Sequence, residues 1–171
     1  MSPDPDAKVS HPLFARCYGW LSQKAEAAGM ADIRQELLAG LSGRVVEVGS
    51  GNGMNFRHYP VSVEAVTAVE PEPYLRARAE HASTEAAVPV QVVPGGAERL
   101  PFPDGTFDAG VASLVLCSVR DQDAALAELR RVVRPGGELR FYEHVRAWTP
   151  LLAAAQRAAD RAWPLSMEAA T

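Results

Sequence analysis

The ten residues 44–53, RVVEVGSGNG, constrain the fold of this chain more than any other stretch. Three valines around a single acid, Glu47, predict a short buried strand. Three glycines at alternate positions follow it, as expected where a strand turns sharply and a ligand approaches bare backbone. The G-x-G-x-x-G fingerprint of dehydrogenases is not matched, because position 54 is Met54. The stretch therefore predicts a nucleotide-cofactor site that departs from the dehydrogenase pattern.

Length and composition restrict the classes of protein to consider. A chain of 171 residues can bury a sizeable core as one domain, and we expect no separate substrate domain. The net charge of −4 is spread along the chain, and Arg130 and Arg131 form its longest basic run, so nucleic acid is not an expected partner. Cys17 and Cys117 have no metal-ligand spacing, which argues against a disulfide framework and against a metal site.

The sequence shows no sign of export or of membrane insertion. Its amino terminus, MSPDPDAK, has acids and prolines where a signal peptide would have a basic and then an apolar region. No apolar run approaches the ~18 residues of a membrane span. We therefore expect a cytoplasmic protein without a membrane span, in which residues 1–10 form a disordered tail.

Strand and helix patterns alternate along residues 11–171, which we assign to a single domain. Residues 11–43 are expected to form two leading helices, either packed on the body of the domain or closing over the substrate as a lid. Strands are predicted at residues 45–48, 63–69, 88–93, 107–115 and 139–145, and helices at 72–86, 122–133 and from 150 to about 163. This alternation implies an α/β fold with a Rossmann-like, doubly wound parallel sheet of about five strands in the order 3-2-1-4-5.

A sheet of this kind binds ligands at the carboxyl ends of its strands, beside the point where the strand order reverses. The glycine turn follows the first strand, and Glu70 ends the second strand 21 residues after Gly49. That separation suits an acid that accepts hydrogen bonds from ribose hydroxyls. The turn 95–98, Cys117 and His144 follow the next three strands. All of these residues are therefore expected at one edge of the sheet.

Four stretches, in this order and spacing, resemble the class I S-adenosylmethionine (SAM)-dependent methyltransferases: VVEVGSGNG, the acid of AVEPEP, GGAERLPFPDGTFD and LRRVVRPGGELRF. The chain looks like the small-molecule branch that includes the ubiquinone/menaquinone methyltransferases. SLVLCSVRDQ, FYEHV and RAW are similar more narrowly to the methyltransferase-like thiol methyltransferases. The resemblance covers about residues 44–164 and implies an enzyme that transfers a methyl group from SAM to a thiol, phenol, quinone or amine.

The resemblance also implies which residues contact SAM. The glycine loop would pass under its methionine and ribose, Glu70 would hold the ribose hydroxyls, and the turn 96–98 would meet the adenine edge. The strand end at Leu114 and Cys117 would lie beneath the methionine part. The implied set is Glu47, Gly49, Ser50, Gly51, Gly53, Glu70, Pro71, Gly96, Ala97, Glu98, Leu114 and Cys117.

The sequence departs from the family pattern at Gly96. Many relatives have an Asp there, which accepts a hydrogen bond from the adenine amino group. Loss of a hydrogen bond to a charged group costs about 1.5–3 kcal/mol, so we expect weaker binding unless the backbone of Ala97 or the side chain of Glu98 replaces it.

Methyl transfer from a sulfonium is an in-line displacement, in which the protein positions the acceptor and removes its proton where needed. His144 is the candidate general base, because it is the one histidine that the predicted fold places at the active edge. The alternative is that His144 only closes the pocket or bonds a neighbouring loop. Cys117 is expected to be a small apolar pocket residue, since no His/Asp partner has the spacing that would make it a nucleophile. The sequence leaves the acceptor open.

The family sheet has seven strands, and the last two are not predicted here. The fifth strand would then be an exposed edge, which favours either a homodimer through that edge or a truncated protein of low stability. We also consider two alternatives to a SAM-dependent methyltransferase. One is a SAM-binding or interaction protein with impaired catalysis. The other is an NAD-dependent oxidoreductase, against which the missing third glycine and the lack of a Tyr-x-x-x-Lys pair both argue.

Overall fold

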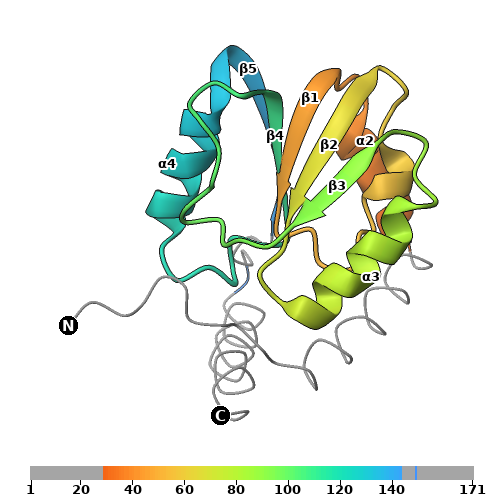
Figure 1. Cartoon of the computed structure of the whole chain (residues 1–171), viewed down its shortest axis with the longest axis horizontal. Coiled ribbons are helices and arrows are strands. Elements are labelled where there is room, and N and C mark those ends of the chain that lie inside the picture. Colours follow the sequence, from red (N-terminus) through yellow and green to blue (C-terminus); the bar gives the residue numbers. More distant parts are fainter. Residues whose placement is uncertain (1–28, 144–148, 150–171) are drawn as a thin grey trace.

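The computed structural model describes residues 29–143 and 149, and Figure 1 shows how they are arranged. They form one sheet in the order β3-β2-β1-β4-β5, in which every neighbouring pair is parallel. Its strands are β1 (Gly43–Val48), β2 (Val63–Val69), β3 (Val90–Val93), β4 (Phe107–Ser113) and β5 (Val133–Tyr142). The predicted strand order and the Rossmann-like fold class are confirmed.

Three α-helices and one short 3-10 helix lie in the described part of the chain. They are α2 (Ala31–Leu38), η2 (Phe56–His58), α3 (Pro73–Ser83) and α4 (Gln122–Val132). The helices α3 and α4 both begin at an acid that satisfies a backbone amide of the first turn. Glu72 accepts from the Leu75 amide at 2.7 Å, and Asp121 accepts from the Ala124 amide at 2.9 Å. Both helices therefore have an acidic N-cap.

The sheet separates two buried apolar clusters. On one face Phe56 packs with residues of α2, α3 and the strands, and on the other face Leu129 and its neighbours of α4 pack against the sheet. Adjacent β1 residues alternate between them, since Val45 belongs to the first cluster and Val46 to the second. Figure 1 shows α4 apart from α2 and α3. Burial on both faces explains the nearly continuous apolar strands.

The fifth strand begins earlier than predicted. Val133, which follows α4 directly, already pairs with Phe107 of β4, and the register then shifts so that Glu138 pairs with Ala109. Residues 134–137 form this irregularity within β5, whereas their RPGG sequence suggested a loop before the strand. The sequence that ends the helix α4 therefore lies within a paired strand. The turn at Gly136, whose φ is 78°, is short enough for the strand to pair with β4 on both sides of it.

Two strands and one helix are shorter than predicted. The strand β4 ends at Ser113, because Leu114 adopts a left-handed φ of 56° that no strand can continue. The strand β3 starts at Val90, just after Pro89, which has no N–H to donate. The helix α3 spans Pro73–Ser83, within the predicted 72–86.

Several expectations lie outside the described residues: the tail 1–10, the leading segment up to residue 28, the last helix from residue 150, and His144. The helix α2 confirms one of the two leading helices. No helix among the described residues is long and apolar enough to cross a membrane. The same residues contain no group of three or more His, Cys, Asp or Glu side chains that could hold a metal ion.

Candidate functional site

The glycine loop lies at the carboxyl end of β1 and is tied to the end of the neighbouring strand β2. The amides of Gly49 and Ser50 both donate to the Val69 carbonyl, at 2.9 and 3.2 Å. Gly49 has a left-handed φ of 64°, and a Cβ added to it would collide with Val115 Cγ2. Glycine is therefore required at this position for two reasons: its backbone angle and the close approach of the segment after β4.

Glu70, which follows β2, faces the same loop. One carboxylate oxygen accepts from the Gly51 amide at 2.8 Å, and the other accepts from the Glu72 amide at 2.9 Å. The side chain is buried, and burial raises the pKa of Glu70 while the two backbone hydrogen bonds and the charge of Arg76 oppose that rise. The acid and the glycine loop that the sequence predicted as one site are thus in direct contact.

Glu47 is the centre of a buried polar network on the first face of the sheet. Its carboxylate oxygens accept from Asn55 Nδ2 and from the Tyr59 hydroxyl, each at 2.8 Å. Arg34 of α2 extends the network by donating to Asn55 Oδ1 at 2.7 Å. Burial raises the pKa of Glu47 to about 7, against the opposing hydrogen bonds and the Arg34 charge. Glu47 therefore fastens α2 and the segment after the glycine loop to β1.

The turn after β3 is held by the segment between β4 and α4. Glu98 accepts from the Arg120 amide at 2.9 Å through one carboxylate oxygen, and its other oxygen would lie 3.3 Å from a Cβ added at Gly96. Ala97 is buried between them. The structure thus brings the Glu98 carboxylate beside Gly96, the position where a relative's Asp would stand. Its contact with adenine stays a prediction.

Arg131 of α4 fastens the linker that follows this turn. Its guanidinium donates to the carbonyls of Leu100 and Phe102 at 3.0 and 2.8 Å, and it also pairs with Asp104 and Glu128 at 2.7 Å. The same Glu128 accepts from the Leu100 amide at 2.7 Å. These contacts explain how a linker without regular structure keeps one path across the sheet.

The segment that follows β4, residues 114–117, also lies at the carboxyl ends of the strands. Leu114 donates from its amide to the Tyr142 carbonyl at 2.7 Å, and the Val115 amide donates to Glu143 at 2.9 Å. Cys117 is exposed, and its Sγ lies 3.9 Å from the Leu114 carbonyl. The assignment of Cys117 to the pocket stays a prediction.

Two buried hydroxyls test whether this edge suits a polar cofactor. Ser50 Oγ in the glycine loop and Ser113 Oγ at the end of β4 have no hydrogen-bond partner within the described structure. The two residues are 7% and 8% exposed, so neither hydroxyl is compensated by bulk water. A buried hydroxyl without a partner costs free energy. The site therefore offers unused hydrogen-bonding groups where the resemblance places the methionine part of SAM. These hydroxyls suit the polar carboxylate and amine of that part of the cofactor.

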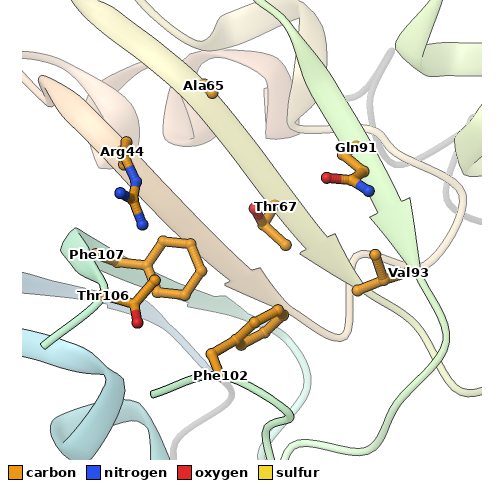
Figure 2. A pocket seen from close by; sticks show the side chains of 8 residues that line it. All are labelled: Arg44, Ala65, Thr67, Gln91, Val93, Phe102, Thr106 and Phe107. Atoms are coloured by element: carbon orange, nitrogen blue, oxygen red, sulfur yellow. The ribbon is translucent and has the colours of Figure 1, made fainter. Parts of the chain in front are cut away.

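A separate pocket of about 290 Å³ lies beside the strands β1, β2 and β3, and its lining extends from Arg44 near the start of β1 to Val93 at the end of β3. Figure 2 shows Thr67 and Gln91 from two neighbouring strands beside Phe102 and Phe107. Arg44 closes it at the start of β1, with its guanidinium 5.7 Å from the centre of the Phe107 ring. The sequence analysis did not predict this pocket.

Sequence reasoning also missed several residues of the edge. Asn55, Tyr59 and Glu143 were not assigned to it, although the first two bond Glu47, which was, and Glu143 bonds the Val115 amide next to Leu114. An acid in the apolar run 45–48 was a signal that a buried polar partner must exist. Nothing in the sequence indicates which residue supplies it. Pro71 is exposed, and its carbonyl accepts from Arg76 at 3.1 Å.

Comparisons with known proteins agree on a family. Residues 46–141 match a family model described as a methyltransferase domain. The human thiol S-methyltransferase TMT1B is 42% identical over 117 residues, covering 63% of this chain and 46% of the relative. The human thiol S-methyltransferase TMT1A is 37% identical over 155 residues, covering 80% of this chain and 60% of the relative. The chain therefore spans about half to three fifths of the length of these relatives.

A solved structure is similar to this chain in fold. It is described as a putative S-adenosyl-L-methionine-dependent methyltransferase from Methanococcus maripaludis, and it matches with a TM-score of 0.69. The match covers 96% of this chain and 78% of that structure at 17% identity, so it bears on the fold alone.

Proposed function

Because the chain belongs to the methyltransferase domain family, we propose that it transfers a methyl group from SAM to a small-molecule acceptor, and that this acceptor is a thiol. The family supports SAM as the cofactor, which is also the methyl donor that the sequence resemblance implies. The thiol is favoured because the two relatives named above, which match over 117 and 155 residues, are thiol S-methyltransferases. The observation that carries the proposal is the contact between Glu70 and Gly51, together with two buried serine hydroxyls, of Ser50 in the same loop and of Ser113 at the end of β4, that have no partner in the described structure.

Different residues at this edge of the sheet would bind different parts of SAM. Glu70 keeps free lone pairs on both oxygens beyond its two backbone bonds, so it can accept from ribose hydroxyls. Ser50 and Ser113 would hydrogen-bond the methionine carboxylate or amine. Glu98 would accept from the adenine amino group in place of the Asp that Gly96 lacks. In this assignment Glu47 acts indirectly, by holding Asn55 and Tyr59 behind the glycine loop.

SAM supplies a methyl group already activated on a sulfonium. The protein must then align the acceptor sulfur behind the methyl carbon, so that the new S–CH3 bond forms as the old one breaks and S-adenosylhomocysteine leaves. The thiol proton has to be removed, because the thiolate is the nucleophile. We assign this proton to His144, which lies outside the described residues and directly follows Glu143.

The test is turnover of the purified chain with SAM and four acceptors of matched size: an aliphatic thiol, a phenol, a hydroquinone and an amine. We expect release of S-adenosylhomocysteine with the thiol at a rate at least about tenfold above the other three. Faster turnover of another acceptor would overturn the thiol assignment and leave methyl transfer standing.

The two alternative functions have distinct outcomes in companion assays. Tight binding of S-adenosylhomocysteine without turnover of any acceptor would indicate a SAM-binding protein with impaired catalysis. Thermal stabilisation by NAD alone would indicate an oxidoreductase and would contradict the proposal. We expect stabilisation by S-adenosylhomocysteine and none by NAD.

A homodimer through the edge strand β5 and a cytoplasmic location stay predictions. The strand β5 is at the edge of the described sheet, and Phe141 on it is 42% exposed. An exposed strand edge with an apolar side chain favours pairing with a second copy. Light scattering at micromolar concentration should give the mass of a dimer, and a stable monomer would exclude this arrangement.

A further inference from the structure

We propose that Glu143 is a positioning residue of the cofactor site, which holds the turn after β4 against the glycine loop. The inference rests on the proposed function and deepens it, because it names a residue that fixes the geometry of the SAM site without touching SAM. No pattern in the sequence predicted this role.

The contacts of Glu143 converge on one short segment. Its Oε1 accepts from the Val115 amide at 2.9 Å and from the Leu116 amide at 3.0 Å, across 27 to 28 positions of sequence. The side chain is half-buried. A carboxylate oxygen that accepts from two successive amides fixes the backbone more tightly than a single bond can.

The same segment needs such support. Leu114 has a φ of 56°, the only left-handed angle of a non-glycine residue in the described chain. This angle is strained for a branched side chain and persists where the surroundings impose it. The Tyr142 carbonyl accepts from the Leu114 amide at 2.7 Å, so residues 142 and 143 together bind three successive amides of the turn.

The turn in its fixed position touches the glycine loop. Val115 fills the space in front of Gly49 so closely that a Cβ there would collide with it. Ser113, whose hydroxyl has no partner, immediately precedes the turn, and Ser50, the other such residue, follows Gly49. The position that Glu143 imposes on Val115 therefore sets the spacing between the two serine hydroxyls assigned to the methionine part of SAM.

The experiment measures the affinity of the full chain for S-adenosylhomocysteine by calorimetry at a temperature well below the melting point of every variant. Glu143→Ala removes the acceptor, and we expect binding about tenfold weaker or more. Glu143→Gln keeps a carbonyl oxygen at the same reach, so we expect an affinity within about threefold of wild type. Glu138→Ala is the matched control, because Glu138 lies on the same strand and its side chain forms an ion pair with Arg140 at the surface.

The outcomes separate this inference from the proposed function. Wild-type protein that does not bind S-adenosylhomocysteine would overturn both. Wild-type binding with unchanged affinity in Glu143→Ala would overturn the positioning role alone. A lower melting point in Glu143→Ala with unchanged affinity would also overturn it, since that is the result of a merely structural contact.

A second variant keeps the test decisive if Glu143→Ala does not fold. Glu143→Asp retains the charge and withdraws the carboxylate by one methylene. We expect it to bind S-adenosylhomocysteine more weakly than Glu143→Gln, because the position of the acceptor matters and its charge does not. The reverse order would contradict the inference.

Discussion

The Glu70 carboxylate and the Gly51 amide are joined by a hydrogen bond of 2.8 Å that links the end of β2 to the glycine loop after β1. The second Glu70 oxygen binds the Glu72 amide, so one side chain fixes the loop and the entry to α3 together. Through these two bonds the acid sets the shape of the proposed cofactor site before any ligand arrives.

Replacing Glu70 by Ala should weaken both binding and folding. The Gly51 and Glu72 amides would lose their buried acceptor, at a cost of about 2 kcal/mol in the free energy of unfolding. The affinity for S-adenosylhomocysteine should fall by about tenfold to a hundredfold, measured by calorimetry. Glu64→Ala, at an exposed position of the same strand, serves as the control. An unchanged affinity in Glu70→Ala would remove Glu70 from the cofactor site.

Gly49 and Gly136 form a matched pair for testing the approach of Val115. Both have a left-handed φ, of 64° and 78°, but only the Cβ added at Gly49 meets another atom. Replacement of either by Ala should cost about 1 kcal/mol for the backbone angle. The Gly49→Ala variant should lose a further ~1–3 kcal/mol from the collision. Equal unfolding free energies in urea for the two variants would contradict this close approach.

The stability of the protein should depend on pH through Glu47. Burial raises its pKa in the folded state to about 7, from an ordinary value of 4.5. Between these values the folded protein holds a proton that the unfolded chain releases. The stabilisation is therefore complete below about pH 4.5 and declines as the pH rises through about 7, by about 3 kcal/mol in all.

The measurement for Glu47 is urea unfolding from pH 5 to pH 8, compared between wild type and Glu47→Gln. The variant cannot ionise at this position, so the difference between the two proteins isolates the contribution of Glu47. We expect wild type to lose stability relative to the variant across this range. Parallel pH profiles would show that Glu47 keeps an ordinary pKa in the folded protein.

Arg131 should stabilise the linker after β3. Its guanidinium bonds the carbonyls of Leu100 and Phe102, so Arg131→Ala should lower the free energy of unfolding. Proteolysis should also become faster within residues 100–104. Arg130→Ala, an exposed neighbour on α4, is the control and should change neither quantity. If cleavage of the linker is equally slow in both variants, Arg131 does not hold it.

The sequence predicted the order of the strands and the place of the candidate site. Buried parallel strands read as short apolar runs that alternate with helices, and this alternation predicted a doubly wound sheet in the order β3-β2-β1-β4-β5, which the structure confirms. The glycine pattern and Glu70 were found in the same way, because backbone geometry at a sharp turn restricts the residue type locally.

The tertiary structure alone decided which groups face one another. The Glu47 carboxylate binds Asn55 and Tyr59, and Glu143 binds the turn after β4. The alternation of buried and exposed residues along the strands predicted neither set of contacts. The boundary of β5 was also missed, since pairing of Val133 with Phe107 overrides the local helix-stop signal. Hydrogen bonds between residues far apart in sequence depend on how the helices and loops pack against the sheet, and no local pattern encodes that packing.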